Sequence, residues 1–395
     1  QRQMCIRDRN KAGGYDGITA EHFKFGGPLF IQTVTQIFNN ICHVEMIPIQ
    51  FKRGILIPIP KGDKDRSIQD NHRGITLLQT MRKIFEKGLL QKNIKKWIKL
   101  GKIIDDLQGA SQDHCSSLET NWLVRETIHH YTEQDTDIYV CMLDVKKAFD
   151  SVWQDALFHK LHNYGMDPKV WRMIKELYDK PKCCVRVGHT VSDWITATVG
   201  IIQGGPLSMM NYQMMSKDLL SDLRECTAGT VIGDMVTTAP AFAEDLIVMA
   251  PSRSGLQKLI DIAFDHSYKW RYSYNAKKCA ILALGKLNDE KPFKLGAAEI
   301  KIIQSHDHVG TILSKSKQDV VKYIKDRVDP CSKPAYAIMS IGSYVAPMTP
   351  KSASNLYWSI CIPKLTYGCQ IMSLSLIHIS EPTRLLVQSR FASSA

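Results

Sequence analysis

Acidic side chains follow or separate the apolar segments that this sequence is expected to bury. Asp144 comes directly after the apolar run 139–143, and Glu244 and Asp245 stand between the apolar runs 239–243 and 246–250. An unpaired carboxylate at the end of a buried strand costs several kcal/mol unless a cation or hydrogen bonds compensate it. Mg²⁺ prefers hard oxygen ligands and shares them with substrate phosphates. Two such ions about 3.5–4 Å apart would clamp the attacking and leaving oxygens of a phosphoryl transfer.

Each of these acids also has an ordinary interpretation. Asp144 is compatible with an acid at the start of a helix, and Glu244 and Asp245 with a solvated turn. Taken singly, these interpretations are favoured. The hypothesis of a divalent-metal site depends on residues a hundred positions apart meeting at the ends of neighbouring strands.

Composition and charge limit the function classes. The chain has 395 residues, 44% of them hydrophobic and 23% charged, which is ordinary for a globular protein. Lys and Arg number 51 against 39 Asp and Glu, a net charge of +12. Such an excess favours a polyanionic partner, nucleic acid first and an anionic membrane surface second. No apolar run reaches the roughly 18 residues of a membrane span, and the N-terminus lacks the apolar region of a secretion signal. The eleven cysteines form no C-x-x-C pair, so we expect reduced thiols in an intracellular protein rather than a zinc site or disulfides.

Periodicity predicts the elements that would carry these acids. The apolar runs on either side of Glu244 and Asp245 predict a tight hairpin. The elements follow no steady alternation of strand and helix, which favours an α+β fold over a doubly wound sheet. A mainly helical tail is expected over 315–372. The expected helices are 29–46, 77–97, 151–162, 168–178, 208–223 and 254–271, and the expected strands are 54–60, 139–143, 183–187, 194–199 and 280–284.

The segments around the acids resemble the motifs of a known family. Residues 142–152, MLDVKKAFDSV, resemble motif A of the reverse transcriptases of non-LTR (LINE, jockey-like) retrotransposons. Residues 200–208, GIIQGGPLS, resemble motif B, and 241–246, AFAEDL, resemble motif C. Further stretches resemble the family's other motifs in the same order: 11–18, 57–62 and 71–78 upstream, and 275–278 (motif D), 308–310 (motif E) and 365–368 downstream.

The resemblance implies a right-hand polymerase with fingers over 10–138, an RRM-like palm over 139–290, and a helical thumb with following helices over 291–372. Residues 1–9 and 373–395 resemble translated sequencing-adapter sequence. We expect them to be artefacts and exclude them from functional reasoning.

The resemblance also implies the roles of individual residues. Asp144, Glu244 and Asp245 would be the catalytic acids that ligate two Mg²⁺ ions, with Mn²⁺ as a substitute. Lys61 and Arg73 would hold the incoming triphosphate, and Phe149 would lie against its sugar and exclude a 2′-hydroxyl. Gln203 and Gly204 would form a turn beside the nucleotide, and Lys278 would act on the leaving pyrophosphate. The ordinary alternatives are surface cations for Lys61, Arg73 and Lys278, a core aromatic for Phe149, and a plain helix-entry turn for Gln203 and Gly204.

The implied activity is RNA-directed DNA polymerase, with an RNA template, a DNA primer and dNTPs as partners and no membrane. The endonuclease domain of the same element would be a further partner, and the family's life cycle implies the cytoplasm and the nucleus. Four features depart from the family pattern: Glu244 replaces an Asp, Gly205 an Asp and Gly74 a Pro, and residues 108–111, QGAS, lack the basic residue expected in the loop between fingers and palm. These departures keep a second hypothesis open, that of a decayed remnant which only binds nucleic acid. A third is a palm polymerase of another template or nucleotide class; Phe149 argues against the use of ribonucleotides.

Overall fold

The computed structural model describes residues 12–62, 64–101, 103–112, 115–285, 292–314 and 349–371, with the single positions 332, 334, 336 and 337. Both predicted artefact ends and much of the predicted helical tail lie outside these residues. The chain divides into two compact units. Unit 1 comprises Gln1–Ser111, Asp144–Glu225 and Ile262–Asn275, and unit 2 comprises Gln112–Leu143, Cys226–Asp261 and Ala276–Ala395. The boundaries of fingers, palm and thumb given above stay a prediction.

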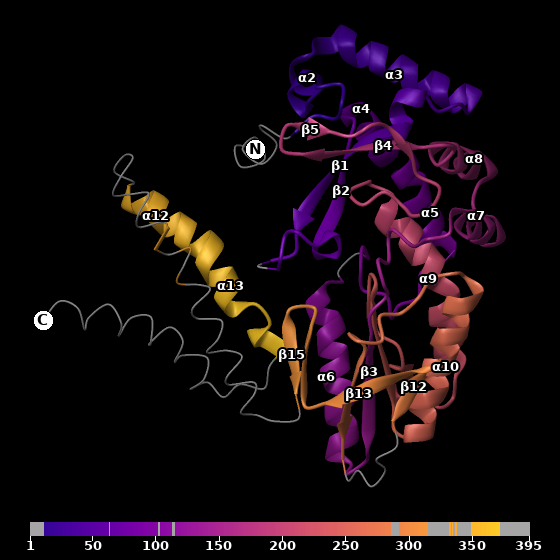
Figure 1. Cartoon of the computed structure of the whole chain (residues 1–395), viewed down its shortest axis with the longest axis vertical. Coiled ribbons are helices and arrows are strands. Elements are labelled where there is room, and N and C mark those ends of the chain that lie inside the picture. The colour runs from indigo at the N-terminus through magenta and orange to yellow at the C-terminus, as the bar shows by residue number, and fades with distance from the viewer. Residues whose placement is uncertain are drawn as a thin grey trace, which may run out of the picture. The chain divides into compact units, whose positions relative to one another are not determined.

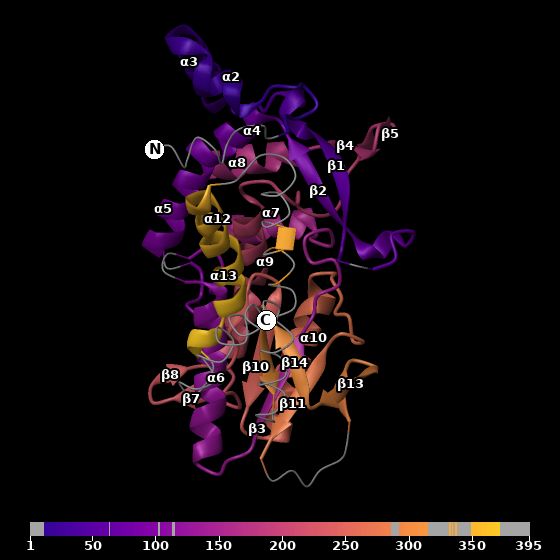
Figure 2. The same ribbon diagram turned by 90° about the vertical axis from the view of Figure 1, so that its left-hand side faces the viewer.

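Unit 1 contains a sheet built on the hairpin of β1 (Arg53–Pro60) and β2 (His72–Leu78). β4 (Lys182–Val187) runs parallel to β1 but pairs only with its residues 53–56 (Figure 2). The two prolines at 58 and 60 therefore lie beyond the β4 pairing, where their missing N–H groups cost no ladder bond on that side. The short strands β5 (Thr190–Val191) and β6 (Ile195–Thr196) pair with β4.

The helices of unit 1 surround one hydrophobic core. The start of α8 (Pro168–Leu177) shows why such a helix begins where it does: the Asp167 carboxylate accepts from the N–H groups of Lys169 and Val170, and Pro168 takes the first helical position. Phe85, Leu157, Leu161, Ile174 and Met214 are fully buried in this core. The helices are α2 (Ala20–Phe25), α3 (Gly27–Val44), α4 (Thr80–Phe85), α5 (Gln91–Gly101), α7 (Gln154–Asn163), α8 (Pro168–Leu177) and α9 (Ser208–Glu225), with the π-helical turn η3 (Glu86–Leu90) and the 3₁₀ turns η1 (Ile49–Lys52) and η2 (Gln69–Asn71).

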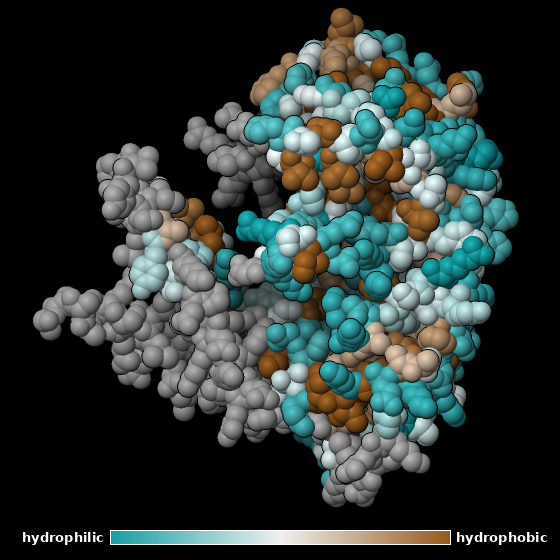
Figure 3. All heavy atoms as spheres, viewed as in Figure 1, coloured by the Kyte–Doolittle hydropathy of each residue, from teal (hydrophilic) through white to brown (hydrophobic). Residues whose placement is uncertain are grey.

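An apolar surface lies over α2 and α3. Phe25, Leu29 and Ile31 are more than half exposed, at 69, 77 and 56%. Apolar residues are visible at the top of the space-filling view, over these two helices (Figure 3). α3 buries only Val34, Phe38 and Ile41.

Unit 2 is built on a six-stranded sheet in the order β12-β13-β11-β3-β10-β9. β3 (Ile138–Leu143) is buried along its whole length and pairs antiparallel with both β10 (Asp245–Ala250) and β11 (Ala280–Leu284). A central strand covered on both faces reads as a continuous apolar run, as IYVCML does. The remaining strands of this sheet are β9 (Ala241–Phe242), β12 (Phe293–Leu295) and β13 (Ala298–Ile303).

α6 (Ser117–Glu133) packs along β3 on one face of this sheet (Figure 1). Its Val124 shares a buried cluster with alternate residues of the strands, including Val140 and Ile247. The Ser116 hydroxyl caps the helix by accepting from the Leu118 N–H. The other elements are α10 (Arg253–Lys269), α12 (Pro350–Leu356), η4 (Tyr357–Cys361), α13 (Ile362–Thr366), η5 (Cys369–Ile371) and the strands β7 (Val231–Ile232), β8 (Met235–Val236), β14 (Ser305–His308) and β15 (Thr311–Ser314).

The α+β class is confirmed, and the predicted helices and strands mostly occur within a few residues of their expected bounds. Two predictions are wrong in part. The helix expected at 77–97 begins only at Thr80, because Leu77 and Leu78 belong to β2, and the strand expected at 194–199 is reduced to β6. The predicted helical tail is confirmed over Pro350–Thr366. None of the described helices is long and apolar enough to cross a lipid bilayer, and the nine described cysteines are free thiols.

The hairpin of β14 and β15 connects the motif E segment, 308–310, with the stretch 365–368. Val309, a β-branched residue at φ 43°, forms its turn, and the Val309 carbonyl accepts a hydrogen bond of 3.1 Å from the Tyr367 hydroxyl. Tyr367 also lies 2.7 Å from the Ser117 hydroxyl of α6. The motif E segment is thus tied to the residues 365–368.

Burial of His308 in this hairpin makes stability depend on pH. Its side chain is 5% exposed, and burial lowers its pKa to about 4, with a smaller contribution from His306. The unfolded chain binds the proton at a pKa of about 6.5, so stability falls as the pH drops from about 6.5 towards 4. Between pH 7 and pH 5 we expect His308 to account for a loss of about 2 kcal/mol in the free energy of unfolding.

Urea unfolding of the wild type and of His308→Gln at pH 7 and pH 5 measures this contribution. The variant should lose about 2 kcal/mol less than the wild type over this range. His189→Gln, at an exposed position between β4 and β5, is the control and should keep the wild-type dependence. Equal losses in the wild type and His308→Gln would contradict the expectation.

Candidate active site

The register of β3 and β10 determines where the main chain of two of the predicted acids lies. Leu143 is the partner of Leu246 in this antiparallel pair. Asp144 is the next residue after Leu143, and Asp245 is the residue before Leu246. The Cα atom of Asp144 is therefore about 3.8 Å from that of Leu143, and the Cα atom of Asp245 is equally far from that of Leu246.

Glu244 occupies a different kind of position from Asp245. β9 and β10 form a hairpin in which Phe242 pairs with Asp245, so Ala243 and Glu244 form a two-residue loop. Ala243 has a φ of 58°, a left-handed conformation that two-residue hairpin loops require at their first position. The predicted tight hairpin with the acids at its tip is confirmed. The departure from the family pattern falls on the loop, whereas Asp245 is the residue held in the sheet.

The donor set at these positions suits a hard divalent cation. Among the described residues, no three His, Cys, Asp or Glu side chains converge as a ready-made metal site. Mg²⁺ does not need one, because it is commonly held by one or two carboxylates together with waters and substrate phosphates. Asp144 and Asp245 offer oxygen ligands of this kind.

A basic cluster lies at the hairpin of β1 and β2 in unit 1. The Lys61 ammonium donates to the Asp70 carbonyl at 2.9 Å, and the Lys147 ammonium is 2.8 Å from the Asp70 carboxylate. The hydrogen bond and charge of Lys147 lower the pKa of Asp70, as do Lys146 and Lys61 more weakly. Three lysines act on the Asp70 carboxylate, and two of them, Lys147 and Lys61, also act on the Asp150 carboxylate, so positive charges outnumber negative ones among these groups.

Arg73 belongs to β2 in the same hairpin. It pairs across the ladder with Ile59, two residues before Lys61, and its side chain is exposed. The structure therefore brings Lys61 and Arg73 onto one hairpin of unit 1. Lys278, by contrast, stands in the turn before β11 in unit 2 and is exposed.

Gln203 joins the motif B turn to two other segments. Its amide donates to the Asp150 carboxylate at 3.3 Å, and its carbonyl accepts from the Thr76 N–H of β2 at 2.9 Å. Burial raises the pKa of Asp150, and this rise is only partly offset by the charges of Lys147 and Lys61 and by the Gln203 hydrogen bond. The predicted turn of Gln203 and Gly204 is thus part of the same cluster as Lys61.

Gly204 allows the close approach between the motif B turn and β2. It has a φ of 98°, and a Cβ built on it would lie 3.1 Å from the Thr76 carbonyl oxygen. Any other residue at this position would be strained and would have to push the turn away from β2.

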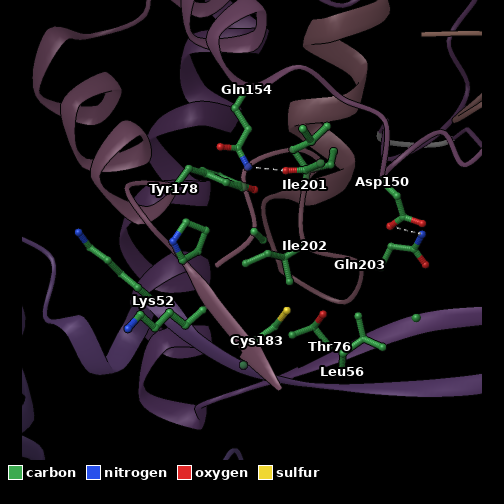
Figure 4. Close-up of a pocket in the computed structure, with 17 residues that line it drawn as sticks. Lys52, Leu56, Thr76, Asp150, Gln154, Tyr178, Cys183, Ile201, Ile202 and Gln203 are labelled. Carbon is green, nitrogen blue, oxygen red and sulfur yellow. Dashed lines mark hydrogen bonds between the residues drawn. The ribbon is translucent and has the colours of Figure 1, made fainter. Parts of the chain in front are cut away.

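A pocket of about 140 Å³ lies between the β1–β2 hairpin, the start of α7 and the motif B turn (Figure 4). Ile202 points into it, Ile201 also contributes to its lining, and the Gln154 amide closes one side by donating to the Gly200 carbonyl at 2.9 Å. Asp150 and Gln203 lie at another side. The lining also includes Gly74, one of the departures from the family pattern.

Phe149 lies in the core-facing part of unit 1. Its ring stacks on Tyr212 of α9 at a centroid distance of 5.2 Å and an interplanar angle of 21°. Phe149 is half-buried, so part of the ring remains accessible. Its role as a filter for the nucleotide sugar stays a prediction.

Asp150 and Lys147 also belong to this cluster, although neither was predicted as a site residue. Both lie within the stretch quoted as motif A, so the signal that could have found them was their position six and three residues after Asp144. Their contacts with Asp70, Gln203 and Lys61 come from segments far apart in the chain.

Comparisons with known proteins agree with this architecture. The family described as reverse transcriptase (RNA-dependent DNA polymerase) matches residues 59–324. The chain belongs to this family, and the α+β right-hand polymerase fold inferred from the motifs is that of the family.

The relatives are proteins of mobile elements. The protein described as "RNA-directed DNA polymerase from mobile element jockey" of Drosophila melanogaster is 24% identical over 92% of this chain and 40% of its own length. "Transposon TX1 uncharacterized 149 kDa protein" of Xenopus laevis is 28% identical over 66% of this chain and 19% of its own length. A solved telomerase structure from Candida Tropicalis shares 12% identity and a TM-score of 0.47 over 87% of this chain and 58% of its own. The chain thus spans well under half the length of these two curated relatives, and its resemblance to a non-LTR retrotransposon reverse transcriptase is confirmed.

The close approach at Gly204 gives a test of the motif B turn. In Gly204→Ala the new methyl group meets the Thr76 carbonyl, so we expect the free energy of unfolding to fall by about 2 kcal/mol. Gly188→Ala is the matched control, because Gly188 also has a positive φ (59°) but no atom within 4 Å of the place that its Cβ would take. The control should lose about 1 kcal/mol. Urea unfolding measures both, and an equal loss would show that Thr76 does not constrain the turn.

Proposed function

We propose that this chain is the polymerase part of a retrotransposon protein and copies an RNA template into DNA from a primer 3′-hydroxyl. The observation that carries the proposal is the register of β3 and β10. It pairs Leu143 with Leu246, and Asp144 and Asp245 are the neighbours of these two residues in the chain. Membership of the reverse transcriptase family supports the same activity. The substrates would be dNTPs, a DNA primer and an RNA template. The endonuclease domain of the same element would be a partner, and the protein would act in the cytoplasm and the nucleus.

The two aspartates would hold the divalent ions of this reaction, most simply two Mg²⁺. Bound there, such ions would lower the charge of the phosphates and stabilise the attacking and leaving oxygens. Asp144 and Asp245 would contribute carboxylate oxygens at fixed positions because each is anchored by a buried strand. Glu244, in the hairpin loop, would serve as a third and more adjustable acid.

The basic cluster of unit 1 would orient the triphosphate. Lys61 supplies a point charge, and Arg73 can make bidentate contacts with phosphate oxygens. The motif B turn would place the main chain of Gln203 and Gly204 beside the nucleotide. Phe149 would contact the sugar, and Lys278 would meet the departing pyrophosphate.

Glu244 specifically favours a second candidate function, that of a remnant that binds nucleic acid without extending it. A glutamate carries its carboxylate one methylene further than aspartate. A misplacement of about 1 Å in a positioned site can cost on the order of 10²-fold in rate. However, Glu244 lies in the hairpin loop, outside the paired residues, where the longer side chain can be accommodated. This position favours an active enzyme over the remnant.

Primer extension on an RNA template with Mg²⁺ or Mn²⁺ tests the proposal. The wild type should extend the primer with dNTPs, and Asp144→Asn should lower the rate on the order of 10³-fold because a metal ligand is lost. Asp234→Asn, exposed in the turn between β7 and β8, is the control and should extend like the wild type.

The outcome with Glu244→Asp separates the two candidate functions. Extension by the wild type, lost in Asp144→Asn, supports the enzyme. Extension only after Glu244→Asp supports the remnant. Extension by Asp144→Asn at the wild-type rate would refute the assignment of Asp144.

The exposed lysines of α5 predict how binding of nucleic acid depends on salt. Lys95, Lys96 and Lys99 are exposed and form no ion pair among the described residues. If they neutralise phosphates of a single-stranded template, changing all three to Gln should reduce the slope of log K against log salt by about 2. Fluorescence anisotropy with a labelled RNA at several salt concentrations measures this slope.

The matched control changes three exposed lysines of unit 2, Lys258, Lys294 and Lys301, to Gln. It alters the net charge equally, so an equal decrease in slope would mean that only total charge matters. An unchanged slope in the α5 variant would exclude this helix from the template contact.

A further inference from the structure

A short segment after α10 holds the main chain of Asp144. The Asn275 N–H donates to the Asp144 carbonyl at 2.8 Å, and the Lys146 N–H donates to the Ser273 carbonyl at 2.9 Å. Val145 and Tyr274 form an antiparallel bridge between these two bonds. Beyond the end of β3, the segment 273–275 is therefore the backbone partner of the residues that carry the predicted acid.

The segment is itself anchored through Tyr272. The chain leaves α10 through Arg271, at φ 58°, and the Tyr272 N–H donates to the Ser267 carbonyl at 3.1 Å. The Tyr272 hydroxyl lies 2.9 Å from His266 Nδ1 and 3.3 Å from the Tyr274 hydroxyl. Burial raises the pKa of Tyr272 well above its usual value, so its hydroxyl keeps the proton that it can donate.

His266 connects this anchor to a buried carboxylate. Its Nε2 lies 2.9 Å from Asp218 Oδ1, and the other carboxylate oxygen of Asp218 accepts from the Trp270 indole at 3.1 Å. The Lys160 ammonium also donates to Asp218 and to the Met215 carbonyl. The side chains of Lys160 and His266 are only 3 and 4% exposed. One carboxylate of α9 thus receives bonds from α7 and α10.

The hydrogen bonds of this network run in one direction. Burial lowers the pKa of His266, in spite of the opposing effect of Asp218, so the imidazole is neutral and carries one proton. Because the Asp218 carboxylate can only accept, that proton is on Nε2, and Nδ1 is left to accept from the Tyr272 hydroxyl. Tyr272 can then accept from Tyr274. The hydroxyl of Tyr272 has one place to donate, which fixes the orientation of its ring.

We propose that Asp218, His266 and Tyr272 are positioning residues for Asp144, because they fix the segment 272–275 whose main-chain bonds hold that residue. A buried ionic network adds little net stability compared with apolar packing, whereas it can specify one arrangement. The inference rests on the proposed polymerase function, in which Asp144 is a metal ligand.

The variant Tyr272→Phe tests the proposal, because it removes one oxygen atom and leaves the ring. We expect kcat of primer extension to fall on the order of 10-fold, with a smaller change in KM for dNTP, because Lys61 and Arg73 lie on the β1–β2 hairpin and form none of these hydrogen bonds. Hydrogen exchange of the Lys146 and Asn275 amides should rise about tenfold as their hydrogen bonds weaken.

Tyr268→Phe is the matched control, since Tyr268 lies near the end of α10, four residues before Tyr272, and is 83% exposed. It should leave kcat and both amides unchanged. Asp218→Asn and Asp218→Glu form a second pair: Asn should reproduce the Tyr272→Phe effects or exceed them, and Glu should restore part of the activity. Thermal unfolding of each variant shows whether it still folds. A variant that folds like the wild type but extends more slowly has lost the placement of Asp144 and not the fold.

Wild-type exchange at Lys146 and Asn275 in Tyr272→Phe would overturn the proposal, and so would faster exchange with an unchanged kcat. A wild type without any extension would refute the proposed function instead. In that case, faster exchange at the two amides would still support, and wild-type exchange would still overturn, the link from Tyr272 to the Asp144 main chain.

Discussion

The antiparallel pairing of β3 with β10 is the constraint on which the candidate active site depends. Both strands are buried, so their register is fixed by which side chains face the core, and a slip of one residue would turn every side chain to the opposite face. The same register that buries the apolar side chains pairs Leu143 with Leu246. Asp144 and Asp245 are the sequence neighbours of these two paired residues. Packing of apolar residues therefore determines the starting point of two polar ones. What lies beyond Leu143 is held by other means, through the main-chain bonds to the segment 273–275.

The elements with strong periodicity could be predicted from sequence, and those without it could not. β3, β10 and α8 were expected within a residue or two of their bounds, because a continuous apolar run or a capped amphipathic helix has few alternatives. α6 was missed, since its buried face includes Thr120, Asn121 and Thr127, which do not read as apolar. β13 was missed for a related reason: it alternates Lys and Glu with apolar residues and pairs parallel with β11, a contact that no local signal reveals.

The candidate site could be predicted in part for similar physical reasons. The types and order of Asp144, Glu244 and Asp245 were visible in the sequence, and so was the hairpin that carries two of them. The cluster of Lys61, Lys147, Asp150 and Gln203 depends on contacts between segments separated by tens of residues, and only coordinates show it. The distinction between Glu244 in the loop and Asp245 in the ladder likewise needed the register. Consequently the same glutamate that looked like a defect in the sequence stands where a longer side chain is most easily accommodated.

The division into two units has a consequence for how the protein is made. The chain passes between the units at 111/112, 143/144, 225/226, 261/262 and 275/276. Each unit is made of three separate segments with parts of the other unit between them, so unit 1 lacks its last segment until residue 275 has left the ribosome. Contacts between residues this far apart form slowly and leave apolar surface open to aggregation in the meantime. Nascent chains would therefore depend on chaperones until late in synthesis, and genetic truncation would yield incomplete halves rather than separable domains.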